Sequence, residues 1–161
     1  MLQYPEPAEQ VASAMVNRFA IDMQPKPDFI ASPAIGGIVI GQEVARAIGV
    51  RHIFVEKNVN GIPTLRRGFE VEPGEKFIVV EDVVTTGKST GEVLKVLREF
   101  AAEPIAILAV VDRSGEREMP FGNTSFISLA KLDIATYRPE DCPLCAMEIP
   151  LVKPGSRKTE Q

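Results

Sequence analysis

Apolar residues recur along the chain with two spacings, one typical of helices and one typical of buried strands. Residues 8–20 place Val11, Met15 and Phe19 on one face, which predicts a helix there, and a second helix should end near Ile48. Five short segments have the length and composition of strands: 28–31, 51–57, 77–80, 104–111 and 124–130. Because strands alternate with helices, the sequence predicts an α/β fold with a central, mainly parallel sheet flanked by helices.

The strand that begins at Phe77 leads into the most informative stretch of the chain. Its apolar run is followed by two adjacent carboxylates, Glu81 and Asp82, and then by a turn rich in hydroxyl groups, from Thr85 to Thr90. A helix should follow the turn, and its apolar stripe has four members: Val93, Val96, Leu97 and Phe100. The order of features is strand, acidic pair, polar turn and helix.

This order suits a sugar that carries a phosphate. A turn that opens a helix offers unpaired backbone N–H groups and the positive end of the helix dipole to an anion. Carboxylates would repel a phosphate in the same turn, but one step away they can accept hydrogen bonds from sugar hydroxyls or lie near a metal. The alternative is an ordinary strand-to-helix connection with a capping box of Ser89 and Glu92. A Walker loop is excluded, because Asp82 stands where its first glycine is required.

The motif also carries a family resemblance. It resembles the phosphoribosyl pyrophosphate (PRPP) signature of type I phosphoribosyltransferases. Its residue sequence is most similar to that of the orotate phosphoribosyltransferases: Glu81-Asp82-Val83-Val84-Thr85-Thr86-Gly87-Lys88-Ser89. The resemblance implies the type I phosphoribosyltransferase fold and transfer of the phosphoribosyl group from PRPP to orotate, giving orotidine 5′-monophosphate and pyrophosphate. It implies that residues 81–89 bind PRPP, that Asp82 is catalytic, that Mg²⁺ is the cofactor and that the protein is a homodimer. A transferase for another base and a non-catalytic PRPP-binding regulator are the alternatives.

A second turn between a strand and a helix lies at residues 32–37, Ser-Pro-Ala-Ile-Gly-Gly, and is equally compatible with an anion site or a plain tight turn. The resemblance favours the first, and implies that Ala34, Ile35 and Gly36 bind pyrophosphate. Asn60-Gly61 then predicts a hairpin whose second arm covers residues 62–71.

The hairpin carries three cations: Lys57, Arg66 and Arg67. In the family a mobile loop at this place brings cations to the departing pyrophosphate, so the resemblance implies a catalytic role for Lys57 and pyrophosphate binding by all three. Many orotate enzymes have an Arg-Lys pair where this chain has Glu56-Lys57, and residues 65–69 look like a shorter, Thermus-type bacterial branch. The alternative for each cation is a solvated hairpin edge protected by charge.

The strand at 104–111 ends in Asp112-Arg113, at the position where open α/β sheets bind ligands. Arg113 has the fork geometry to hold a planar carboxylate, and the resemblance implies that Arg113 and Thr85 contact orotate. A structural Asp112–Arg113 salt bridge is the alternative. His52, the single histidine, lies in a strand ahead of the hairpin, where a packing or surface role is expected.

Composition narrows the remaining possibilities. The 161 residues fit one core domain over 1–156 with a tail at 157–161. The net charge of −4 does not indicate a nucleic-acid-binding surface, which would be rich in positive charge. The sequence has no apolar run long enough for a membrane span and only two cysteines, which favours a reducing cytoplasm. Cys142 and Cys145 supply two of the four ligands that a structural zinc site needs. The two interpretations are therefore two ordinary thiols or a metal shared across a dimer. The N-terminal hood of orotate enzymes is missing, and we expect a shortened N-terminus more than a protein that lacks it.

Overall fold

A computed structural model describes residues 2–20, 25–115 and 117–150. The elements in chain order are α1 (Pro5–Ala20), β1 (Phe29–Pro33), α2 (Gly36–Ile48), β2 (Arg51–Lys57), β3 (Pro63–Leu65), β4 (Lys76–Val84), α3 (Lys88–Glu99), β5 (Glu103–Asp112), β6 (Ser125–Lys131), a 3₁₀ turn η1 (Pro139–Asp141) and α4 (Pro143–Ala146). The strands form a six-stranded sheet in the order β3-β2-β1-β4-β5-β6, parallel except where β3 runs against β2. The predicted α/β class with a mainly parallel sheet is confirmed.

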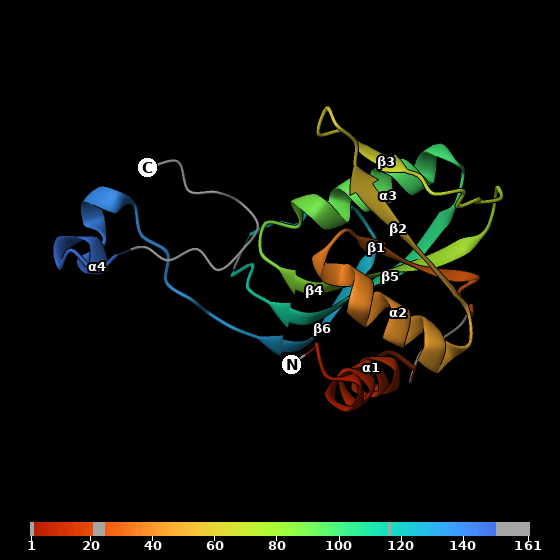
Figure 1. The fold of residues 1–161 in the computed structure, drawn as a ribbon, viewed down its shortest axis with the longest axis horizontal. Helices are drawn as coiled ribbons and strands as arrows, with labels where there is room; N and C mark the ends of the chain where they lie inside the picture. Colours follow the sequence, from red (N-terminus) through yellow and green to blue (C-terminus); the bar gives the residue numbers. More distant parts are fainter. Residues whose placement is uncertain (1, 21–24, 116, 151–161) are drawn as a thin grey trace.

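Helices cover both faces of this sheet, with α1 and α2 on one side and α3 on the other (Figure 1). The alternation of side chains along the buried strands explains this arrangement. In β4, Phe77 and Val79 join the core under α3, whereas Ile78 and Val80 join the core under α1 and α2. All four side chains are fully buried, so β4 is fixed on both faces before it reaches the acidic pair.

The helices differ from the sequence prediction at their ends. Helix α1 begins at Pro5, three residues earlier than expected, since a proline fits the first turn of a helix. Helix α3 begins at Lys88 after Gly87, which has a positive φ of 69° and no side-chain cap, so the capping box of Ser89 and Glu92 in the alternative interpretation is not formed. Phe100 follows the end of α3 and is 42% exposed, because the helix stops before its stripe is complete.

The predicted hairpin is present, but it is shorter and its loop is longer than expected. Pairing runs only from Val55↔Leu65 to Lys57↔Pro63, so most of the predicted second arm at 62–71 is irregular. The loop is closed by the Asn58 side chain, whose Oδ1 accepts hydrogen bonds from the backbone N–H groups of Asn60 and Ile62. A side-chain acceptor thus replaces the two-residue turn that Asn60-Gly61 indicated.

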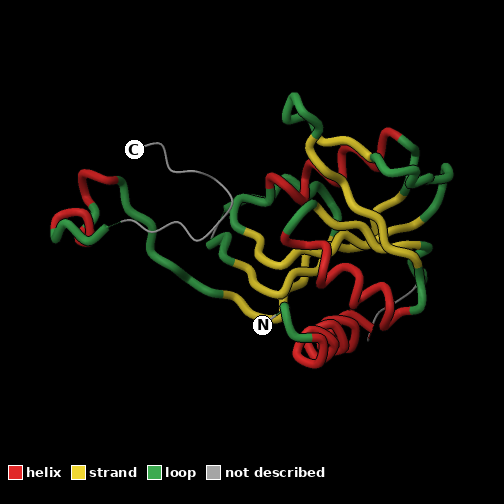
Figure 2. The backbone as a smooth tube through the Cα atoms, viewed as in Figure 1, coloured by secondary structure: helices red, strands yellow, loops and turns green. Residues whose placement is uncertain are grey.

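The segment after β6 leaves the sheet edge as a long arm, which Figure 2 shows extending away from the rest of the chain. It holds η1 and α4, and it exposes apolar side chains such as Ile134 and Leu144. The expected tail at 157–161 and the Pro154-Gly155-Ser156 run lie outside the described residues. None of the helices in the described part of the chain has the length and apolar character needed to cross a membrane.

Candidate active site

The carboxyl ends of the parallel strands meet at one edge of the sheet. Between β1 and β4 the chain order reverses, because β1 continues through α2 to β2 on one side and β4 continues through α3 to β5 on the other. Helices that leave neighbouring strands toward opposite faces open a crevice at such a switch point. The acidic pair stands at the end of β4, directly at this crevice.

The two carboxylates of the pair differ in environment. Glu81 is only 6% exposed, whereas Asp82 is partly exposed at the crevice. Burial is the largest cause that raises the pKa of Glu81 to about 9, and the hydrogen bond and negative charge of Asp82 contribute to the same shift. Backbone N–H groups hold both side chains, from Asp82 to Glu81 Oε1 at 3.2 Å and from Val83 to Asp82 Oδ1 at 2.7 Å. At neutral pH Glu81 is therefore protonated.

The turn after β1 lies directly against this pair. A Cβ atom added to Gly36 would lie 2.7 Å from Asp82 Oδ2, and one added to Gly37 would lie 2.9 Å from the Val80 carbonyl oxygen. Glycine at both positions is what lets the turn come this close. The backbone N–H of Ala34 donates to the Val55 carbonyl at 2.8 Å, which ties the turn to β2, and the Ala34–Ile35 peptide bond is cis. The predicted pyrophosphate residues thus lie beside the predicted ribose-binding carboxylates.

The turn between β4 and α3 forms a hollow on the other side of the pair, lined by Glu81 and residues 83–90. Thr85, Thr86 and Ser89 are exposed in it and free to meet a ligand. Gly87 is required here, because it has a positive φ and an added Cβ would lie 2.9 Å from the Phe121 ring. The first turn of α3 supplies backbone N–H groups at the same point, as a phosphate site needs.

Only one of the three predicted hairpin cations reaches the site. Lys57 lines a small hollow with Ala34 and Ser89, and its Nζ lies 3.2 Å from the Glu92 carboxylate on α3. Lys57 therefore connects the β1 turn to the β4–α3 turn.

Arg66 and Arg67 are placed differently. Both pair with Glu56, at 3.8 Å and 2.9 Å, and Arg67 also lies over the Phe54 ring. The Arg67 hydrogen bond, together with the charges of both guanidinium groups, lowers the pKa of Glu56. In this arrangement the two arginines stabilise the hairpin and do not line the hollow that Lys57 occupies.

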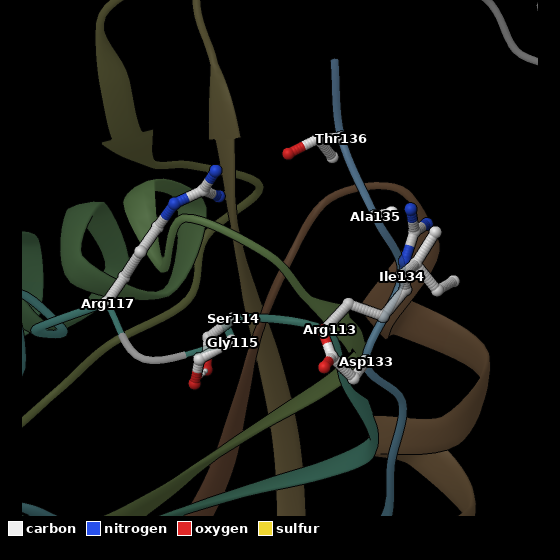
Figure 3. Close-up of a pocket in the computed structure, with 8 residues that line it drawn as sticks. All are labelled: Arg113, Ser114, Gly115, Arg117, Asp133, Ile134, Ala135 and Thr136. Atoms are coloured by element: carbon white, nitrogen blue, oxygen red, sulfur yellow. Dashed lines mark hydrogen bonds between the residues drawn. The ribbon is translucent and has the colours of Figure 1, made fainter. Parts of the chain in front are cut away.

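A larger cavity of about 460 Å³ opens at the ends of β5 and β6 (Figure 3). Its lining is Arg113, Ser114, Gly115, Arg117, Asp133, Ile134, Ala135 and Thr136. It adjoins the phosphate hollow, since the Arg113 backbone N–H donates to the Val84 carbonyl at 2.8 Å. Asp112 accepts a hydrogen bond from the Ser114 N–H and forms no ion pair with Arg113, so the salt-bridge alternative is not formed in the described residues.

Sequence reasoning missed most of this cavity. Arg117 could have been found, because it follows Arg113 by four residues in the same short loop. Residues 133–136 carry no motif, and only the pairing of β6 with β5 brings them to the cavity wall.

The single histidine lies away from the acidic pair. His52 is half-buried, its Nε2 is 3.1 Å from Ser32 Oγ, and both atoms press against Gly41, where an added Cβ would clash with them. Burial lowers the pKa of His52 to about 4, so the imidazole is neutral at physiological pH. These contacts fit the packing role that the sequence predicts.

Cys142 and Cys145 lie at α4 on the arm as free thiols. The Cys145 backbone N–H and thiol lower the pKa of Cys142 by hydrogen bonding. Within the described ranges, no cluster of three or more His, Cys, Asp or Glu side chains could hold a metal ion.

Comparisons with known proteins agree with this geometry. A family described as "Phosphoribosyl transferase domain" matches residues 2–135. The chain is 47% identical over 158 residues to the orotate phosphoribosyltransferase of Caldanaerobacter subterraneus, covering 98% of this chain and 80% of the relative. It is 50% identical over 128 residues to that of Thermotoga maritima, covering 80% and 67%. Among solved structures, Mycobacterium tuberculosis orotate phosphoribosyltransferase in complex with PRPP superposes with a TM-score of 0.66 at 20% identity, over 81% of this chain and 76% of that one, which shows the fold.

Proposed function

Because the chain belongs to the phosphoribosyltransferase family, and its curated relatives are orotate phosphoribosyltransferases, we propose that it transfers the 5-phosphoribosyl group from PRPP to orotate, giving orotidine 5′-monophosphate and pyrophosphate. One observation carries the proposal most directly. The acidic pair lies between two anion-sized turns, one against Gly36 and one at residues 83–90. PRPP carries an anionic group on each side of a ribose diol, so its charge pattern matches this arrangement.

The two carboxyl groups take different parts in the reaction. Protonated Glu81 can donate a hydrogen bond to a ribose hydroxyl, and the partly exposed carboxylate of Asp82 can accept one. The negative charge of Asp82 also favours the positive charge that develops on the sugar ring as pyrophosphate leaves. Residues 85–90 hold the 5′-phosphate through backbone N–H groups and hydroxyls, as helix N-termini do.

The opposite turn and the hairpin receive the leaving group. Backbone groups of residues 34–36 bind the pyrophosphate, and Lys57 neutralises part of its charge from the hollow it shares with Ala34 and Ser89. Lys57 must exchange its contact with Glu92 for the ligand, which costs little because an exposed ion pair is worth about 1 kcal/mol or less. Arg66 and Arg67 contact the pyrophosphate only if the hairpin closes over the site and their ion pairs with Glu56 break.

Mg²⁺ fits this donor set as a metal that the substrate brings with it. Asp82 offers a partly exposed carboxylate, and no cluster of three acidic ligands surrounds it in the described residues. Mg²⁺ commonly binds through one or two carboxylates, waters and substrate phosphates. When bound, it would screen the negative charge of the pyrophosphate. Residues 1–156 as one core domain, a homodimer and a cytoplasmic location complete the proposal.

The direct test is the loss of orotate absorbance on mixing the protein with PRPP, orotate and Mg²⁺. We expect turnover that needs all three components and that adenine does not replace. The Thermotoga maritima relative serves as the positive control. Turnover by that control but none by this chain, at any protein concentration, would refute the proposed activity.

A further inference from the structure

The two cysteines of the chain lie together on the arm that follows β6. Figure 1 shows α4, which carries them, well apart from the sheet and from the helices that cover it. Cys142 and Cys145 are separated by two residues, and backbone hydrogen bonds hold the turn between them. The Ala146 N–H donates to the Cys142 carbonyl and the Glu148 N–H to the Cys145 carbonyl, both at 3.0 Å. The backbone therefore fixes the two thiols relative to each other, and the proposed transferase reaction uses neither.

The arrangement of the two thiols suits a single metal ion. Cys142 and Cys145 are close enough to interact by hydrogen bonding, and the Cys142 sulfur also accepts from the backbone N–H groups of Leu144 and Cys145. Two thiolates on one tetrahedral zinc ion lie about 3.7 Å apart, because each Zn–S bond is about 2.3 Å long. Donors that contact a ligand atom from outside orient it toward the metal. The turn thus presents two sulfur ligands on one side.

One copy of the chain leaves such a site half complete. A structural zinc site needs four protein ligands, commonly cysteine and histidine. The sequence has no third cysteine, and its single histidine, His52, is half-buried in β2 beside Ser32. Among the described residues, no three His, Cys, Asp or Glu side chains are grouped around one point. The same two thiols of a second copy would supply the two ligands that are lacking.

The surface around the thiols is also incomplete in one copy. Leu144, Met147 and Ile149 are each at least 50% exposed. Of the elements in the described part of the chain, α4 packs chiefly against the short turn η1. Two α4 segments joined by one metal ion would cover these apolar side chains, and their removal from water favours the association.

We propose that Cys142 and Cys145 bind one zinc ion together with the same two residues of a second copy, in a tetrahedral site of four thiolates. Zinc fits four sulfur ligands in this geometry. Binding releases the thiol protons to solvent and needs no oxidant. The proposal goes beyond the transferase activity and does not depend on it. A disulfide between the two thiols of one chain is the competing outcome.

Cobalt(II) is the probe for this site, because it replaces zinc in tetrahedral sites and absorbs visible light. The reduced, metal-free chain is titrated with Co²⁺ in the absence of oxygen. We expect thiolate-to-cobalt charge-transfer bands and tetrahedral d–d bands that reach their maximum at one ion per two chains, and Zn²⁺ should displace the cobalt. A maximum at one ion per chain, or no thiolate band, would overturn the proposal.

Variants identify the ligands. C142S and C145S should each weaken cobalt binding at least about 100-fold, because each change removes two of the four ligands of the shared site. Met147→Leu is the matched control, since it removes the other sulfur atom at the end of α4 and keeps an apolar side chain. It should bind cobalt as the wild type does. Undiminished binding in either cysteine variant would contradict the assignment.

The freshly purified protein separates zinc binding from a disulfide. It should contain about half a zinc ion per chain, and its thiols should react with a thiol reagent only after the zinc is chelated. Protein purified without zinc, whether its thiols are free or joined in a disulfide, would overturn the proposal. None of these measurements uses PRPP or orotate, so a failure of the proposed transferase activity is a separate result.

Discussion

The two halves of the site are built in different ways. The PRPP half is tightly packed: Glu81 is almost fully buried, and neither Gly36 beside Asp82 nor Gly87 beside Phe121 has room for a Cβ atom. The base half is made of exposed side chains, Arg113 and Arg117, on a loop at the open end of β5. One half is held by the sheet core, while the other can change without disturbing the core.

This difference explains why the family signature lies in the PRPP half, whereas the choice of base depends on the base half. A closely packed turn tolerates few residues at its glycines, because an added Cβ at Gly36 or Gly87 meets neighbouring atoms at 2.7 Å or 2.9 Å. Exposed loop residues tolerate many substitutions, so different bases can be accommodated on one scaffold. Variants in the two halves should therefore fail in different ways.

The largest effect is expected at the carboxylate of the PRPP half. Asp82→Asn removes the charge that stabilises the developing positive charge, and we expect kcat to fall about 100-fold or more. Steady-state rates with saturating PRPP and orotate measure this. The control Asp141→Asn alters an exposed aspartate on the arm and should leave kcat unchanged. A loss in D82N that appears only in KM would contradict a transition-state role.

A selective effect is expected in the base half. Arg113→Ala should raise the KM for orotate about tenfold or more and the KM for PRPP less than about twofold, because Arg113 lines the base cavity and neither the hollow at residues 83–90 nor the hollow beside Lys57. Initial-rate series with each substrate varied in turn give both constants. Equal changes in the two KM values would mean that the halves are not independent.

Variants of the three hairpin cations test whether the PRPP half includes the hairpin. Lys57→Ala should lower kcat/KM for PRPP about tenfold, whereas R66A and R67A should lower it less than about threefold, since only Lys57 lines the hollow beside Ala34. R66A and R67A should instead lower the melting temperature slightly by releasing Glu56. A loss in R67A as large as that in K57A would show that the hairpin brings Arg67 into the site.

The smallest effect is expected on the stability of the protein, through the buried carboxyl group of Glu81. The pKa of Glu81 in the folded protein is about 9, above its usual 4.5, so its contribution to stability is complete below about pH 4.5 and is lost as pH rises toward 9. Glu81→Gln removes this dependence, because glutamine imitates the protonated form at every pH.

Thermal unfolding from pH 5 to pH 9 measures it. The melting temperature of the wild type should fall relative to E81Q by on the order of 5 °C across this range. A constant difference between the two proteins would show that Glu81 is already ionised in the fold. Lys57→Ala, outside the core, is a control whose pH profile should follow the wild type.

Much of the fold and of the PRPP half could be read from the sequence. The period of the apolar residues identifies the strands, and the order of acidic pair, polar turn and helix in residues 81–90 identifies the phosphate turn, because these features are local in the chain. Boundaries were less predictable. Glu92, a capping-box residue only in the alternative interpretation, pairs with Lys57 from a distant strand, and Phe100 lies beyond the helix end.

By itself, the sequence determined the fold class and the PRPP motif, since both depend on residues close to one another along the chain. Only the tertiary structure decided where the hairpin cations lie: Lys57 lines a hollow with Ala34 and Ser89, while Arg66 and Arg67 pair with Glu56. It also decided which residues line the cavity at the ends of β5 and β6, because the pairing of β6 with β5 brings Asp133 to the same cavity as Arg113. Contacts between distant segments depend on strand order and register, which short-range sequence patterns do not specify.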